Sequence, residues 1–95
     1  MGKTKRKIHI RERLANTLDL PLDAFLDITR ITMLSDKDLL IENYDGLYLY
    51  SDNEITVTAE GKRLTVLGSG LVITGAFGGR MVITGTIRSV SYSDD

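Results

Sequence analysis

Short runs of β-branched residues, separated by glycine, fill the last third of the chain. The runs begin at Ile55, Leu64, Leu71 and Met81, and seven of the nine glycines lie from Gly61 onward. Val, Ile and Thr favour extended strands because their χ1 torsions are restricted, and glycine adopts the positive φ that tight turns require. This pattern predicts a compact stack of strands joined by turns.

One turn in this segment also predicts a strand register. With a two-residue turn at residues 60–61, Val57 lies opposite Leu64 and Thr56 lies opposite Thr65. That register places apolar side chains on one face of the hairpin and threonines on the other, whereas a shift by one residue would exchange the faces. We therefore expect an antiparallel hairpin at this position.

A second hairpin is predicted in the middle of the chain. The segments Leu39–Asn43 and Leu47–Ser51 flank Tyr44–Gly46. A three-residue loop that ends in a left-handed glycine would place Ile41 opposite Leu49. The sequence therefore predicts that these two strands are neighbours in the sheet.

The first third of the chain has a helical period instead. Apolar positions from Ile8 to Leu18 fall mostly on one helical face, and Pro21 ends that helix and suits the first turn of a second short helix through Leu26. The period then becomes strand-like. This change predicts a first strand over Ile28–Met33 and a polar turn at Ser35–Asp38.

Two near-copies leave two alternatives for the architecture. Leu71-Val-Ile-Thr-Gly-Ala and Met81-Val-Ile-Thr-Gly-Thr recur ten residues apart. They form either a hairpin with a loop at Phe77–Gly79 or successive rungs of a short β-solenoid. Because the turn at residues 60–61 favours antiparallel pairing, we predict a mainly β fold. In this fold short N-terminal helical segments precede an antiparallel β-meander that forms a small sandwich or open barrel.

The composition fits one domain. At 95 residues and 42% hydrophobic content, the chain is large enough for a single core. It contains no cysteine and no run near the roughly 18 apolar residues that a membrane span requires, so a cytoplasmic location is expected. We divide the chain into a basic, flexible segment at residues 1–13 and a single β-rich domain with an N-terminal helix at residues 14–95.

Positive charge is concentrated at the start of the chain. Residues 1–13 carry a net charge of +5 with histidine neutral, whereas the remainder carries −6. Lys5, Arg6, Lys7 and Arg11 are therefore candidate contacts for an anionic membrane surface. Nucleic acid is not an expected partner, because no aromatic residue lies between these bases and the rest of the chain is acidic.

No group of residues has the spacing that catalysis or metal binding requires. His9 is the one histidine, and Pro21 interrupts the helix on which the three aspartates of residues 19–27 would share a face. The acidic residues of Asp36–Asp38 and Glu42 fit a turn and an exposed strand face. No enzymatic activity, metal or cofactor is expected.

Several short segments share an order and spacing that is more specific than any one of them. They are the stretch from Arg13 through Leu18-Asp-Leu-Pro21, then Asp27-Ile-Thr-Arg30-Ile-Thr, Leu40-Ile-Glu42-Asn-Tyr-Asp-Gly46, Leu64-Thr-Val-Leu-Gly68 and the ending Val82-Ile-Thr-Gly85-Thr-Ile-Arg-Ser-Val90-Ser-Tyr. Together they cover most of the chain and resemble the YabP/YqfC family of sporulation proteins. The loop at Phe77–Gly79 departs from the acidic or polar residues expected in that family.

The resemblance implies a role in endospore formation. Members of the family are made in the mother cell and are associated with development of the forespore envelope, coat or cortex, and no enzymatic activity is established for them. The resemblance also implies a protein partner, a YqfD-like integral membrane protein. We therefore expect a non-enzymatic assembly or adaptor protein in the mother-cell cytoplasm, peripheral at the forespore membrane.

Two modes of action remain open. In the first, the module binds a second copy of itself or the membrane-bound partner through exposed strand edges. Ile87–Tyr92 is a candidate edge, and Tyr48, Tyr50 and Tyr92 are candidate contacts, the first two on one face of their strand. In the second, the basic residues 1–13 and the amphipathic helix dock on an anionic membrane.

Overall fold

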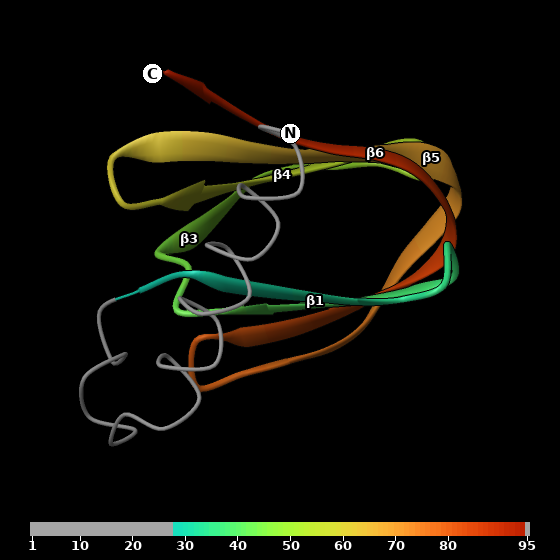
Figure 1. Ribbon diagram of the computed structural model, residues 1–95, viewed down its shortest axis with the longest axis horizontal. Coiled ribbons are helices and arrows are strands. Elements are labelled where there is room, and N and C mark those ends of the chain that lie inside the picture. Colours follow the sequence, from blue (N-terminus) through green and yellow to red (C-terminus); the bar gives the residue numbers. More distant parts are fainter. Residues whose placement is uncertain (1–27, 95) are drawn as a thin grey trace, which may run out of the picture.

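The computed structural model describes residues 28–94, which form a single antiparallel sheet of six strands. The order across the sheet is β1-β2-β6-β5-β4-β3 (Figure 1). The helices predicted between Ile8 and Leu26, and the basic residues 1–13, lie outside the described residues. The strands are β1 Arg30–Leu34, β2 Asp38–Glu42, β3 Gly46–Tyr50, β4 Glu54–Ala59, β5 Lys62–Phe77 and β6 Arg80–Asp94.

The long hairpin of β5 and β6 belongs to both halves of the sheet. β2 pairs with residues 80–84 of β6, whereas β4 pairs with residues 62–67 of β5. Figure 1 shows that the hairpin bends between these two regions, so that the two halves of the sheet face each other. We call β1, β2 and the hairpin's turn-side half the lower layer. The upper layer consists of β3, β4 and the other half of the hairpin.

Glycine makes the bend possible. The register of β5 against β6 shifts after Leu67, between Ser69 and Val72, and again after Ile73. Gly70 and Gly85 have φ values of 60° and 140°, a region that favours glycine. These shifts are β-bulges, which bend a strand and increase its local twist. Glycines of the last third of the chain therefore bend one hairpin, in addition to closing turns.

Two turns bind the backbone at the bend. The β1–β2 turn lies against β6, and the β3–β4 turn lies against β5, so backbone N–H groups at the bend have hydrogen-bond acceptors. The bonds run from the N–H of Ile87 to the carbonyl of Asp36 (2.7 Å), Gly85 to Lys37 (3.1 Å), Gly68 to Asn53 (3.1 Å) and Leu71 to Asp52 (2.8 Å).

The core lies between the two layers and receives alternate residues of each strand, as the period of a half-buried strand requires. β1 and β3 contribute least, because they are the two outermost strands. The buried apolar residues that pack into one cluster are Leu39, Ile41, Ile55, Val57, Leu64, Val66, Leu71, Met81, Ile83 and Ile87.

The predicted hairpin at residues 60–61 is confirmed. Val57 lies opposite Leu64, and Thr56 lies opposite Thr65. The two turn residues have φ values of 53° and 74°, which fit the two-residue turn that favours a twisted hairpin. The hydroxyl groups of the two threonines are hydrogen-bonded at 3.0 Å.

The predicted hairpin of β2 and β3 is wrong. β2 pairs with β1 and β6, and β3 pairs with β4. The connection crosses from one layer to the other: the N–H of Asn43 bonds to the carbonyl of Gly79 at 2.8 Å, and the N–H of Asp45 bonds to that of Thr58 at 2.7 Å. A three-residue connection suits a hairpin or a crossover equally well, and long-range pairing with β6 decides between them.

The meander prediction is correct for part of the sheet. β3, β4, β5 and β6 follow one another as neighbours, but the hairpin of β1 and β2 joins the far side of β6. The solenoid alternative is wrong, because the two near-copies pair antiparallel, with Ile73 opposite Ile83. The predicted edge at Ile87–Tyr92 is confirmed for the described residues: this segment pairs with β5 on one side, and β2 pairs only with residues 80–84 of β6. The strands at the two ends of the sheet order are β1 and β3.

Replacing Gly68 tests the close approach of the two long strands. A Cβ atom at Gly68 would lie 2.0 Å from the backbone oxygen of Thr86, so we expect Gly68→Ala to lower the free energy of unfolding by about 3 kcal/mol. Gly75→Ala is the matched control, because a Cβ atom there meets nothing within 4 Å. The free energies of unfolding are measured in urea. Equal values for the two variants would show that the strands do not require glycine at position 68.

Candidate binding surface

The structure places three of the predicted contact residues. Tyr48 and Tyr50 lie on β3, and Tyr92 lies on β6. Lys5, Arg6, Lys7 and Arg11 lie outside the described residues. The paired strands β4 and β5 separate β3 from β6, so Tyr92 does not form one row with the other two tyrosines.

A β-bulge separates Tyr48 from Tyr50. Leu47 lies opposite Val57, but the register then shifts, so that Leu49 lies opposite Thr56 and Tyr50 opposite Ile55. Residues directly opposite each other share a face of the sheet. Tyr50 therefore lies on the face of the buried Ile55, and the prediction that the two tyrosines share one face is wrong, because the bulge changes the alternation.

Tyr48 is held on the outer face of the upper layer by a cation. The guanidinium carbon of Arg63 lies 3.8 Å from the centroid of the Tyr48 ring, within the range of a cation–π interaction. Tyr50 is held differently: its hydroxyl oxygen accepts a hydrogen bond from the N–H of Ile73 at 3.0 Å. Since Ile73 belongs to the lower layer, this bond joins edge strand β3 to the opposite half of the sheet.

The edge strand β3 is apolar and carries no charge of its own. Leu47, Tyr48, Leu49 and Tyr50 are each 38–54% exposed. Within residues 28–94, no strand lies on the outer side of β3. Lysine and proline are common means of preventing the pairing of such edges, and β3 contains neither. As an edge strand that pairs only with β4, β3 directs the backbone N–H and C=O groups of its outer side away from the described sheet.

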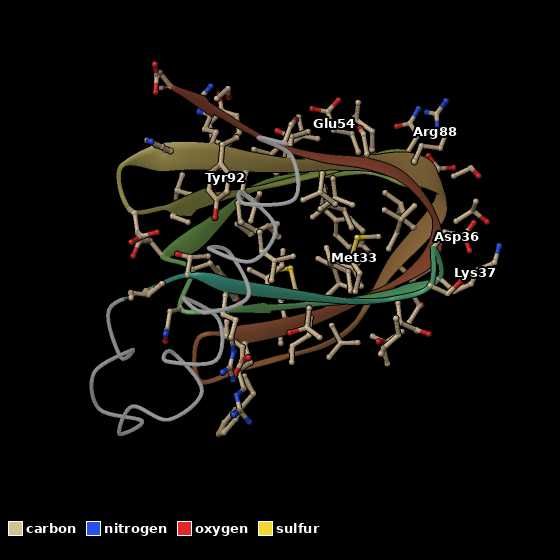
Figure 2. The ribbon with its side chains drawn as sticks, viewed as in Figure 1. Met33, Asp36, Lys37, Glu54, Arg88 and Tyr92 are labelled. Carbon is tan, nitrogen blue, oxygen red and sulfur yellow. The ribbon has the colours of Figure 1, made fainter. Side chains whose placement is uncertain are left out.

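Tyr92 lies at the open end of the upper layer. It is opposite the buried Leu64, and Figure 2 shows its side chain between the layers. Burial raises the pKa of the Tyr92 phenol above its ordinary value of 10.0, and the negative charge of Glu60 raises this pKa further. Tyr92, Glu60 and Lys62 line an open hollow at this end of the molecule.

Glu42 forms an ion-pair row that was not predicted from the sequence. Its carboxylate lies 2.8 Å from the guanidinium of Arg30 and 3.3 Å from that of Arg80, and only 10% of its side chain is exposed. The expectation of an exposed strand face at Glu42 is wrong, because pairing with β6 adds Arg80 on the second side. A hairpin of the first two strands places Arg30 opposite Glu42, so this ion pair could have been predicted from the sequence. No sequence pattern indicated the pairing of Glu42 with Arg80.

The described part of the chain contains neither a metal-binding cluster nor a membrane-spanning helix. Among residues 28–94, no group of three or more His, Cys, Asp or Glu side chains is arranged to hold a metal ion. In the same range, no helix has the length and apolar character needed to cross a membrane.

Comparison with known proteins identifies a family whose model covers all six strands. The model of the YabP family matches residues 27–95. A protein of Bacillus subtilis (strain 168), named "Uncharacterized protein YqfC", is 32% identical over 88 residues, which cover 93% of this chain and 95% of the relative. No solved structure matches.

The raised pKa of Tyr92 gives a prediction for alkaline pH. We expect Glu60→Gln to lower the pKa of Tyr92, while the contribution of burial remains. Because the pKa in the folded state lies above 10.0, the folded protein holds this proton more tightly. The resulting stability is complete below pH 10 and is lost as the pH rises through the folded-state pKa. NMR titration of the Tyr92 ring measures the shift, and an unchanged pKa in Glu60→Gln would contradict it.

The ion-pair row predicts a stability effect at Glu42. Glu42→Gln preserves the shape of the side chain but removes its charge, so we expect a loss of about 1–2 kcal/mol in the free energy of unfolding. Asp52→Asn, in the exposed β3–β4 turn, is the control. The loss should persist at high salt because the carboxylate is largely buried. Equal urea stability of Glu42→Gln and the parent protein would show that the row contributes nothing.

Proposed function

Because the chain belongs to the YabP family, we propose that it is a non-enzymatic assembly or adaptor protein of endospore formation that binds a protein partner along edge strand β3. The observation that carries the proposal is the uncharged, apolar edge at Gly46–Tyr50. An extended segment of a partner adds to such an edge as a further strand, with backbone hydrogen bonds supplying affinity and side chains supplying specificity.

Two contacts within the protein support this mode of binding. The Tyr48 ring is held by Arg63, and the Tyr50 hydroxyl is held by the backbone of Ile73. Because both tyrosine side chains are already held in place, they lose less conformational freedom on binding a partner than mobile side chains would, and this favours affinity. Leu49 lies between the two tyrosines on the same edge strand and is 38% exposed, so it would contact side chains of the incoming strand.

The bulge at Tyr48 supports a specific partner over unlimited stacking. Bulges interrupt the hydrogen-bond ladder and are one of the means by which edge strands avoid open-ended aggregation. A short partner segment can still pair on one side of the bulge. This geometry favours a defined complex, either with a second copy of the chain or with a membrane-bound protein.

We also propose a setting, which rests on what the family resemblance implies. The partner would be a YqfD-like integral membrane protein, and the place of action would be the mother-cell side of the forespore membrane. The described fold supplies a rigid support for that role, because the bend joins both layers through backbone hydrogen bonds.

A lysine on the edge strand tests the proposal. We expect Leu49→Lys to weaken binding to the YqfD-like protein or to a second copy by about tenfold or more, because the charge would be buried against the partner strand. Asp36→Lys is the control, since Asp36 is exposed in the β1–β2 turn at the bend, away from β3. Co-purification with the membrane protein, light scattering of the full chain and counts of heat-resistant spores are the measurements.

The outcomes separate clearly. Loss of association and of spores in Leu49→Lys, with normal association and spore counts in Asp36→Lys, supports the role of β3. If Leu49→Lys folds and associates like the parent protein, β3 is not the binding edge. Normal counts of heat-resistant spores in a spore-forming host that lacks the protein altogether would remove the role in endospore formation.

A further inference from the structure

The lower layer has a second apolar surface, on the side opposite the core. Residues alternate along each strand, so Val82 lies away from the core between the buried Met81 and Ile83. Cross-strand pairing places further apolar residues on the same side. We call this surface the Phe77 face; its exposed apolar members are Leu34, Val72, Phe77 and Val82.

Phe77 is the most exposed large apolar residue of the described chain. Its side chain is 89% exposed, and it ends β5 immediately before the turn at Gly78-Gly79. Those glycines have φ values of 60° and 75°, so they form a tight tip beyond the ring. An aromatic ring at a protruding tip is not covered by its own fold, and exposure of such a group commonly marks a contact site.

Two cations accompany the ring. Phe77 lies opposite Arg80, which lies opposite Glu42, which lies opposite Arg30, so all four occupy one cross-strand row. The arginine side chains are 60% and 68% exposed, whereas that of Glu42 is 10% exposed. The charge that this row presents to solvent is therefore positive.

The basic start of the chain joins the sheet beside this row. The side-chain amide of Asn43 donates to the carbonyl of Ile28 at 2.8 Å, and the N–H of Asn43 bonds to Gly79 at 2.8 Å. Ile28 is thus adjacent to the hairpin tip. Residues 1–27 carry a net charge of +2, with +5 in residues 1–13. The chain that carries this charge therefore meets the sheet next to the hairpin tip.

We propose that the Phe77 face docks on an anionic lipid surface, with the Phe77 ring inserted among the lipids and Arg30 and Arg80 against lipid phosphates. Aromatic rings favour the membrane–water interface, and nearby arginines add attraction to anionic lipid. Asp38 shares this face with Leu34 and Val72 at the end next to the bend, four residues along β2 from Glu42. Asp36 and Glu54 lie at the bend and on the upper layer, away from the face (Figure 2), so the arginines dominate its end at the hairpin tip. The site is separate from edge strand β3, so it does not rest on the function proposed above.

A single tryptophan provides the test, because the full chain contains none. In Phe77→Trp, we expect the emission to shift to shorter wavelength with vesicles of phosphatidylcholine and phosphatidylglycerol, and to stay unshifted with pure phosphatidylcholine. Leu47→Trp on β3 is the matched control and should not shift. We also expect Phe77→Ser to weaken vesicle affinity about tenfold and Arg80→Gln about fivefold in flotation assays.

A variant with fewer positive charges at the start of the chain separates the contribution of those residues to lipid binding from that of the Phe77 face. The variant Lys5→Gln, Arg6→Gln, Lys7→Gln should bind more weakly yet retain the shift at position 77. If Phe77→Ser, shown to be folded by circular dichroism, floats with anionic vesicles like the parent protein, the Phe77 face is not the lipid site. A shift at position 77 that follows protein concentration without vesicles would also overturn the proposal, because a second copy would then cover the face.

Discussion

The close approach of β5 and β6 at the bend is the constraint on which the rest of the structure depends. At Gly68 and Gly85 a side chain would meet the backbone of the facing strand, so the two strands can cross here only with glycine. If the hairpin stayed straight, the apolar sides of its two halves would lie on one flat sheet, exposed to water. The bend instead brings them together, so that β2 and β6 bury side chains against β4 and β5. The β1–β2 and β3–β4 turns are hydrogen-bonded to the bend, and these bonds fix the positions of β1 and β3.

The same bend leaves both ends of the sheet open. β1 and β3 are the outermost strands, in different layers, and no described strand joins them. Their surfaces differ in kind. β3 presents a backbone edge flanked by Tyr48 and Leu49, which is suited to another strand. The lower layer presents a broad face with a protruding ring and two arginines, which is suited to a surface and not to a strand.

Sequence patterns correctly predicted the features that residues close together in the chain determine, such as turns and the register of a hairpin. The turn at residues 60–61 and the register of Val57 against Leu64 were correct because turn length and alternation fix both. The strand composition and the antiparallel repeats were recognised for the same reason. The pairing of β2 with β6 was missed, since it joins residues some forty positions apart and nothing nearby encodes it. The bulge at Tyr48 and the ion pairs of Glu42 both follow from such long-range pairing, so the arrangement of the candidate site could not be predicted.

The two layers are rigidly connected, so the proposed contacts at the β3 edge and at the Phe77 face are held at a fixed orientation to each other. Tyr50 of the upper layer is bonded to Ile73 of the lower layer, and backbone hydrogen bonds close the bend. A partner strand on β3 would therefore be held at a constant angle to a membrane bound by the Phe77 face. Two weak contacts on one rigid body also reinforce each other, because the first raises the effective concentration of the second. A partner that is itself embedded in the membrane gains most from this arrangement, which favours a membrane protein over a dissolved one as the ligand of β3.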